Sequence, residues 1–457
     1  MARGVYWFRN DLRLNFNPLF EKACIENDLL ACVFVHDPRQ YSKTPQGLPR
    51  IGLHRRRFLK ETLLELNTQL NCMNLELIEV WGHPEEVLPQ LIQELSLNRI
   101  YFSLECAPEE KTIENMLRAR LEMDVSIVSD WTHFLIQPSR CPIPISEIPD
   151  VFSDFRRILE RLGLDTLINK SQGEMETFKS WKPKSIKVEE YRALKNVLSL
   201  SEKGSQWWDP FPEEMKVLDH VSSLKGPIEK FLTIRGGESH ALSRLEKYFF
   251  QSRAIENYFT TRNGLLGLFD STLFSPWLAN GSLSAEFIFF QVKKYEQVFG
   301  SRKDTNWVIV ELLWRDFFKF MLLKHGTSFF HPGGFRKKKM PVKSVKQDRD
   351  SLDQLLLAST EESFINANMR ELIQTGFMSN RGRQNVASYA IHQLKIPWFK
   401  AASLFETLLI DYDVASNWGN WAYLAGVGND PRGERVFDVK KQQQMYDQDL
   451  AYTRAWS

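Results

Sequence analysis

Residues Thr375–Asp430 have the sequence TGFMSNRGRQNVASYAIHQLKIPWFKAASLFETLLIDYDVASNWGNWAYLAGVGND. This largely apolar stretch combines indole rings with charged and amide groups: Trp398, Trp418 and Trp421 with Asn380, Arg383, Asp411, Asp413 and Asn417. A buried charge is costly unless it is paired or meets a ligand. The stretch therefore indicates a helical domain around a large, flat ligand with polar edges. The alternative is a structural ion pair in an aromatic core.

The helical pattern extends outward from this stretch, from Gly226 almost to the C-terminus. In Asn306–Asp316, Glu311, Trp314 and Arg315 share one helix face because they are spaced i, i+3 and i+4. They are suited to line a site for a nucleic-acid base. Alternatively, Glu311 and Arg315 form a helix salt bridge worth about 0.3–0.5 kcal/mol. The same spacing recurs in a second helix with Asn380, Arg383 and Gln384.

A hydroxyl-rich turn, STLFSP, covers residues 271–276. Ser275 suits the N-cap of a short helix and Pro276 its first turn. The N-terminus of a helix with additional hydroxyl donors favours phosphate. Most turns of this kind are simple caps, so both interpretations stay open.

The first 130 residues alternate short strands with helices. The predicted strands are Val5–Phe8, Leu30–Val35, Leu75–Val80, Arg99–Phe102 and Val125–Val128. This alternation predicts a doubly wound parallel sheet. Glu105 follows the fourth strand, where such sheets bind ligands, or else it is an exposed loop carboxylate. We expect an α/β domain at 1–130, a connector at 131–225 and a helical domain at 226–457.

Composition excludes several classes of protein. The net charge is only +2, so a nucleic-acid partner would need a local basic groove. The longest apolar runs are too short to span a bilayer, and the N-terminus has no apolar signal core, so a cytoplasmic protein is expected. The five cysteines are scattered and no HExxH occurs, which predicts neither a disulfide framework nor a metal site.

Eight segments together resemble the cryptochrome/photolyase family, and within it the cryptochrome-DASH branch. They are VYWFRNDLRL (5–14), IPDVFSDFR (148–156), RGGESHALSRL (235–245), YFTTRNGLLG (258–267), STLFSPWLA (271–279), ELLWRDFF (311–318), ANMRELIQTGFMSNRGRQNVASY (367–389) and LIDYDVASNWGNWAYLAGVGNDP (409–431). The resemblance covers nearly the whole chain. It implies an α/β domain with an antenna pterin, methenyltetrahydrofolate, and a helical domain that binds FAD.

The resemblance also implies roles for individual residues. Those implied to hold FAD are Tyr258, Ser271, Thr272, Leu273, Phe274, Ser275, Trp307, Arg315, Arg383, Asp411, Asp413 and Asn417, and Glu105 joins the cofactor-binding set. Those implied in the reaction are Glu311, Trp314, Asn380 and Asn417, with Trp421 and Trp398 as inner members of an electron-transfer chain. Nucleic acid is expected to contact Glu311, Trp314, Gln384 and Tyr423.

Gln384 and Tyr423 stand where duplex-acting photolyases resemble one another in having Met and Trp, which favours the DASH branch. The implied activity is that of a photolyase-like lyase: blue-light repair of cyclobutane pyrimidine dimers, mainly in single-stranded DNA, by an electron from reduced FAD. RNA or duplex DNA would bind weakly, and a monomer is expected. The alternative is a photoreceptor that binds FAD and nucleic acid without significant repair.

Two departures from the family pattern stand out. Leu355–Ser363, LLLASTEES, lacks the Trp, Gly and Pro of the corresponding family segment. The outermost tryptophan of the electron chain is expected near Lys343–Lys346, where this chain has none. The start of the helix after Leu355–Ser363 and the terminal electron donor are therefore left open.

Overall fold

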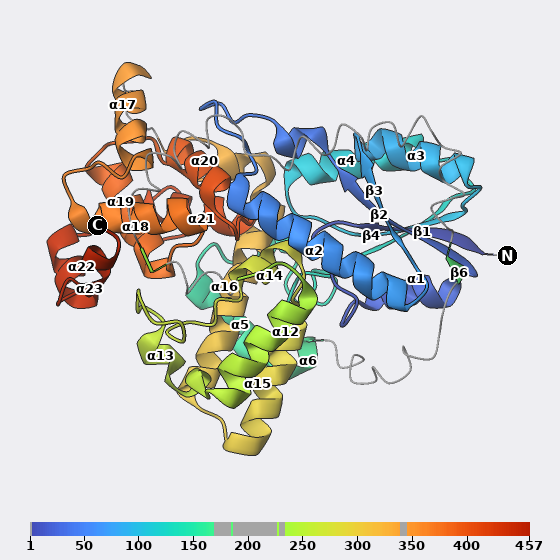
Figure 1. Ribbon diagram of the computed structural model, residues 1–457, viewed down its shortest axis with the longest axis horizontal. Helices are drawn as coiled ribbons and strands as arrows, with labels where there is room; N and C mark the ends of the chain where they lie inside the picture. The colour runs from blue at the N-terminus through green and yellow to red at the C-terminus, as the bar shows by residue number, and fades with distance from the viewer. Residues whose placement is uncertain (1, 169–183, 186–225, 228–233, 339–344) are drawn as a thin grey trace.

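Five parallel strands form the N-terminal sheet of the computed structural model, which describes residues 2–168, 184–185, 226–227, 234–338 and 345–457 (Figure 1). Their order is β3-β2-β1-β4-β5. Their bounds are β1 (Arg3–Phe8), β2 (Leu29–His36), β3 (Leu77–Trp81), β4 (Arg99–Ser103) and β5 (Ser126–Asp130), and the two-residue β6 (Lys184–Ser185) also pairs with β2. The predicted parallel sheet is confirmed, with strand positions close to those expected.

Four helices cover the two faces of the sheet: α1 (Pro18–Glu26), α2 (Leu53–Cys72), α3 (Pro84–Glu94) and α4 (Pro108–Arg120). Successive side chains of a strand point to opposite faces. Accordingly, Val5 and Trp7 of β1 pack with α3 and α4, whereas Tyr6 and Phe8 pack with α1 and α2. Both faces are apolar, so the sheet is doubly wound as predicted.

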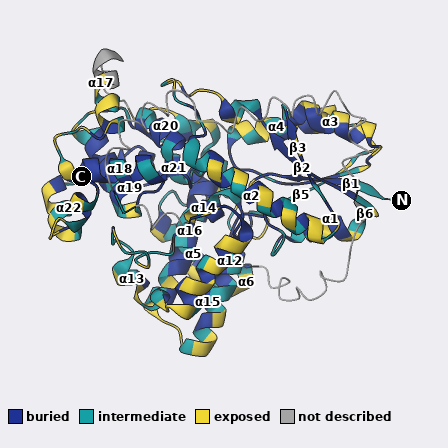
Figure 2. Cartoon of the chain, viewed as in Figure 1, coloured by how far each residue is buried: buried dark blue, intermediate teal, exposed yellow. Residues whose placement is uncertain are grey.

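The rest of the described chain is helical (Figure 1). The helices are α5 (Phe152–Leu162), α6 (Leu164–Leu167), α12 (Glu238–Glu246), α13 (Tyr258–Thr261), α14 (Ser275–Asn280), α15 (Ala285–Phe299), α16 (Lys303–His325), α17 (Val345–Leu356), α18 (Ser363–Thr375), α19 (Asn380–His392), α20 (Trp398–Leu408), α21 (Val414–Leu424), α22 (Val439–Tyr446) and α23 (Ala451–Ala455). Figure 2 shows exposed residues on the outer faces of α12 and α15. More than half of α16 is buried, which makes it the central helix.

Buried polar groups join the sheet domain to the helices. Arg13, 2 % exposed, donates to the carbonyls of Gly281 and Thr132, each at 2.8 Å. Glu238 of α12 accepts from the backbone N–H groups that follow Arg13. Near the start of α2, the His54 ring bonds the Ile373 carbonyl at 2.8 Å. The His54 bond ties the start of α2, which crosses the molecule in Figure 1, to α18.

The segment after β5 packs on α16. Asp316 accepts backbone N–H bonds from Leu135 and Ile136 at 2.9 and 2.8 Å. The ring of Phe155 lies 5.5 Å from that of Phe317. Of the predicted connector at 131–225, only 131–168 and 184–185 lie in the described residues.

The two departures from the family pattern fall around α17. Leu355–Ser363 closes α17 and opens α18, with Ala358 at φ 49° and Thr360 bonded to the Asn366 side chain at 2.7 Å. Residues 343 and 344, part of the region where the outer tryptophan was expected, lie outside the described residues. No described helix is both long enough and apolar enough to cross a membrane.

Candidate functional site

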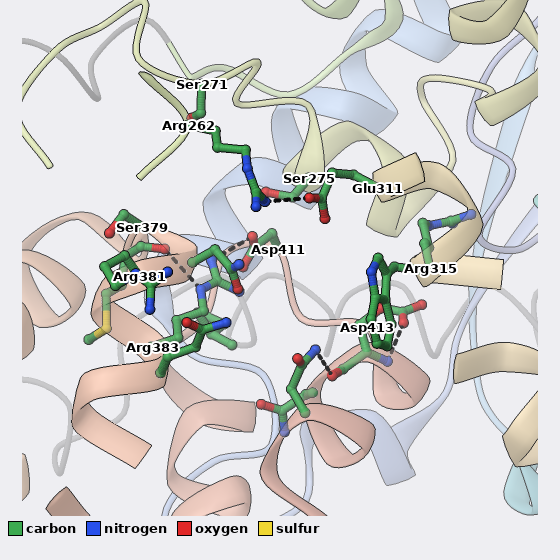
Figure 3. A pocket seen from close by; sticks show the side chains of 18 of the residues that line it. Arg262, Ser271, Ser275, Glu311, Arg315, Ser379, Arg381, Arg383, Asp411 and Asp413 are labelled. Atoms are coloured by element: carbon green, nitrogen blue, oxygen red, sulfur yellow. Dashed lines mark hydrogen bonds and ion pairs between the residues drawn. The ribbon is translucent and has the colours of Figure 1, made fainter. Parts of the chain in front are cut away.

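One pocket of about 570 Å³ lies within the helical domain (Figure 3). Its lining contains every residue that the sequence implied for FAD, nucleic acid or the reaction, except Trp398 and Glu105. The lining comes from α13, the 271–275 turn, α14, α16, α19, α20, α21 and the segments next to α19 and α21. Side chains from distant parts of the sequence therefore meet in one cavity.

Arg383 of α19 and Asp411, just before α21, form an ion pair in this pocket. The Arg383 Nη2 atom lies 2.7 Å from Asp411 Oδ2, and the Asp411 side chain is only 1 % exposed. Arg383 Nε also donates to the Met378 carbonyl at 2.9 Å, which fixes the guanidinium. The buried Asp411 Oδ1 atom has no partner within the described part of the chain. Such an acceptor on a pocket wall suits an N–H group at the polar edge of a flat ligand.

Asp413 lines the pocket next to this ion pair, at the start of α21. Its carboxylate accepts from the Ser416 backbone N–H at 2.7 Å and so caps α21. Burial raises the pKa of Asp413, but the nearby Lys319 and Arg315 outweigh it and hold that pKa below its usual range. Arg315 itself donates to the carbonyls of His133 and Leu278. Asp413 therefore presents a negative charge to the pocket.

The hydroxyl-rich turn forms the upper wall in Figure 3, where Ser271 and Ser275 lie above Asp411. Arg244 stabilises the turn by donating to the carbonyls of Ser271 and Thr272 at 2.9 and 3.0 Å. Leu273 has φ 57°, a left-handed conformation that brings the chain round sharply. Helix α14 begins at Ser275 and has Phe274 at its N-cap, so the predicted cap lies one residue too late.

Glu311 of α16 points toward Arg262, which lies just after α13 (Figure 3). Arg262 Nη1 lies 2.5 Å from Glu311 Oε1, and Trp307 Nε1 donates to the same oxygen at 3.0 Å. The alternative pairing of Glu311 with Arg315 is therefore not what the structure shows. Burial raises the pKa of Glu311, although Arg262 and the Trp307 hydrogen bond oppose that rise. Sequence reasoning missed Arg262 because this pairing is long-range; its only signal was the YFTTRNGLLG segment.

Two aromatic side chains of the pocket lining stand at right angles to each other. The Trp314 and Tyr423 rings are 6.1 Å apart with an interplanar angle of 88°. Asn380 and Gln384, both on α19, also line the pocket. Phe152 stacks on Trp314 with ring centroids 3.7 Å apart, a contact that the sequence did not indicate because Phe152 lies in the predicted connector.

Of the two tryptophans of the predicted electron chain, only Trp421 belongs to the pocket lining. Trp421 lines the pocket and contacts Phe405 edge to face at 5.0 Å. Trp398 is fully buried, donates to the Pro332 carbonyl at 2.7 Å, and lies 5.7 Å from Trp418. Asn417 donates to the Ala402 carbonyl at 2.9 Å, which ties α21 to α20.

Glu105 is separate from this pocket. It lies just after β4, is 9 % exposed, and accepts from the Asn10 side chain at 2.9 Å. Its Oε2 atom is 3.6 Å from His133 Nε2. Burial raises the pKa of Glu105 to about 7. Glu105 is therefore a buried carboxyl at the C-terminal edge of the sheet and not an exposed loop residue.

Comparison with known proteins gives consistent results. Residues 4–172 match the DNA photolyase family model, and residues 307–457 match the model for the FAD binding domain of DNA photolyase. Cryptochrome DASH of Gloeobacter violaceus is 39 % identical over 453 residues, which is 99 % of this chain and 85 % of the relative. Cryptochrome DASH of Xenopus laevis is 38 % identical over 452 residues, covering 98 % and 81 %. The crystal structure of a Synechocystis cryptochrome superposes with a TM-score of 0.84 at 34 % identity, covering 100 % of this chain and 88 % of that one.

Proposed function

The chain belongs to the cryptochrome/photolyase family and groups with its DASH members, and from that premise we propose that it is a light-driven lyase for cyclobutane pyrimidine dimers in single-stranded DNA. One observation supports this proposal above the others. The Arg383–Asp411 pair and the Glu311, Trp314 and Tyr423 cluster line the same 570 Å³ cavity. A cofactor and a substrate base would therefore meet without a wall between them.

The residues present fit FAD, the cofactor that the matching family model supports. Asp411 offers a buried oxygen that is free of partners in the described chain, Asp413 is held ionised, and the 271–275 turn offers hydroxyl groups to phosphate. Bound in the reduced state, FAD supplies the electron that dimer cleavage requires. The protein binds and orients the reactants, keeps water out and sets the electrostatics.

The aromatic pair accounts for substrate binding. Enzymes that act on extruded bases, photolyases among them, must offset an unstacking cost of a few kcal/mol. A single strand avoids most of that cost, and stacking on a side chain such as Trp314 returns about 1–3 kcal/mol per base. Glu311 would accept hydrogen bonds from the base edge. A pocket with the modest aromatic surface of Trp314 and Tyr423 can thus suffice for single strands.

We also propose that the α/β domain binds a pterin antenna, methenyltetrahydrofolate, near Glu105. The site lies where β1 and β4 end, the edge at which doubly wound sheets bind ligands. The proton that Glu105 retains near neutral pH allows it to donate as well as accept a hydrogen bond. Glu105→Ala should lower pterin content while leaving flavin content unchanged, and equal pterin in both proteins would contradict this assignment.

The decisive experiment irradiates matched oligonucleotides, each with one cyclobutane dimer, with blue light in the presence of reduced protein. We expect repair of the single strand, with slower or no repair of the duplex and of RNA. Restored absorbance of the two pyrimidines measures the reaction. A protein that contains flavin and responds to light but leaves every dimer intact would instead be a photoreceptor.

A further inference from the structure

We propose that Phe152 is a positioning residue, which holds the Trp314 indole so that one face of it is offered to a substrate base. This inference rests on the proposed function, because it concerns the wall on which the dimer would stack. Phe152 begins α5 and is 8 % exposed. The sequence motifs indicate no role for Phe152.

The contact between the two rings is face to face. Their centroids are 3.7 Å apart and their planes differ by 16°. Trp314 lines the pocket, whereas Phe152 lies outside the lining, so Phe152 covers the indole from the side away from the cavity. The other ring neighbours of Trp314 among the described residues are Phe317, Phe318 and Tyr423, at 5.7–6.1 Å and in tilted or edge-on orientations. Phe152 is thus the one described ring that sets the plane of the indole by stacking.

Phe152 is itself held by a polar anchor two residues before it. The Asp150 carboxylate accepts from Lys324 Nζ at 2.8 Å and lies 2.9 Å from His325 Nε2, both at the end of α16. Burial raises the pKa of Asp150, but the hydrogen bonds from Lys324 and His325 outweigh it and lower that pKa overall. The Asp150 carbonyl also accepts from Asn429 Nδ2 at 2.9 Å. The start of α5 is therefore fixed to the helix that bears Trp314.

The next residue after Asn429 fixes Tyr423, the ring in edge contact with Trp314. Asp430 is fully buried and pairs with Arg432 and Arg435. Both guanidinium groups also donate to the Tyr423 hydroxyl, at 3.2 and 3.4 Å. Two adjacent buried residues thus connect the Phe152–Trp314 stack with Tyr423. The angle between the two aromatic walls is consequently set by the fold before any substrate binds.

The first test needs no substrate. Protein labelled with 5-fluorotryptophan gives a fluorine resonance for Trp314, identified by its loss in Trp314→Phe. In Phe152→Leu we expect this resonance to broaden or split, because leucine fills the space without a flat face. Phe155→Leu is the matched control: Phe155 is buried on the same helix and contacts Phe317 and Phe320, but no described ring contact joins it to Trp314. An identical Trp314 resonance in Phe152→Leu and wild type would overturn the proposal.

The second test measures binding of a single-stranded oligonucleotide with one dimer. Phe152→Leu should weaken binding about fivefold, which corresponds to about 1 kcal/mol, the scale of one aromatic stacking contact. Phe152→Tyr should restore affinity, and flavin content should stay constant in all variants. Equal affinity of Phe152→Leu and Phe155→Leu would contradict the inference. If wild type binds no dimer while the Trp314 resonance still responds to Phe152, only the proposed function fails.

Discussion

The ion pair with Arg383 offsets the cost of burying the Asp411 carboxylate. The carboxylate is almost completely buried, whereas the Arg383 side chain is 27 % exposed. Removing one partner of a fully buried pair costs about 3–5 kcal/mol, so this partly exposed pair should cost about 2 kcal/mol. We expect Arg383→Met to lower the melting temperature and to lose flavin on purification. Arg370→Met, which removes a bond to the Trp456 carbonyl outside the pocket, is the control. Stoichiometric flavin in Arg383→Met would exclude the pair as a cofactor contact.

In the proposed function, Glu311 recognises the substrate and not the cofactor. Its carboxylate is half of a charge-assisted pair with Arg262 and also accepts from Trp307. A hydrogen bond to a charged group contributes about 1.5–3 kcal/mol. Glu311→Ala should therefore weaken dimer binding at least tenfold while flavin content stays the same. Titration of the reduced protein with a dimer-containing strand measures the effect, and unchanged affinity would remove Glu311 from the substrate site.

Residue types in specific motifs could be predicted from the sequence, but long-range pairings could not. Arg383 and Asp411 occur in a dense, chemically unusual stretch, so both were found. Arg262 and Phe152 were missed because their partners, Glu311 and Trp314, lie 49 and 162 positions away, where no local periodicity connects them. For the same reason the local i, i+4 pairing of Glu311 with Arg315 was a reasonable but wrong alternative.

Among the elements, α16 is joined through Asp316 to the segment that follows the sheet. This fully buried carboxylate accepts from the N–H groups of Leu135 and Ile136, which follow the sheet domain. Leaving buried donors unpaired costs about 1–3 kcal/mol each. Asp316→Ala should thus destabilise the protein by about 3 kcal/mol in urea denaturation, whereas Asp316→Asn, which keeps one acceptor, should lose less. Equal stability of the two variants would show that these bonds contribute little.

Element positions were largely predictable because they follow local signals. The short apolar runs predicted the bounds of the five strands to within about two residues, because a run of this kind favours a buried strand. The predicted N-cap of α14, Ser275, is one residue later than the observed N-cap, Phe274, because either residue can begin the turn. Helix α5 was less visible, since four prolines precede it in 138–149 and suggested irregular chain.

At the scale of the whole molecule, the joint between domains contains buried carboxyl groups. Burial raises the pKa of Glu286, at the start of α15, to about 7 from its usual 4.5, although Arg13 opposes the rise. The folded state thus retains a proton that the unfolded state has lost. The stabilisation is complete below pH 4.5 and disappears as the pH rises through 7.

The change in the free energy of unfolding caused by Glu286→Gln should therefore be about 2 kcal/mol more stabilising at pH 8 than at pH 5. At pH 8 the wild-type protein must bury a charge that glutamine does not have. Urea denaturation at the two pH values measures the difference. The surface residue Glu94 of α3 provides the control, Glu94→Gln. A Glu286→Gln effect that does not depend on pH would contradict the raised pKa.

The predicted supply of electrons to the flavin involves the whole helical domain, because an electron would have to travel from the protein surface to the pocket. Trp421 is 3 % exposed and is the described tryptophan of the predicted chain that lines the pocket. We therefore expect Trp421→Phe to abolish most light-dependent flavin reduction by an external thiol, measured by time-resolved absorption. Trp398→Phe should have a smaller effect if another aromatic side chain can be oxidised in place of Trp398. Trp418 is such a side chain, since it lies 5.7 Å from Trp398 and donates to the Tyr412 hydroxyl. Undiminished reduction in Trp421→Phe, with flavin content equal to wild type, would show that electrons enter by another route.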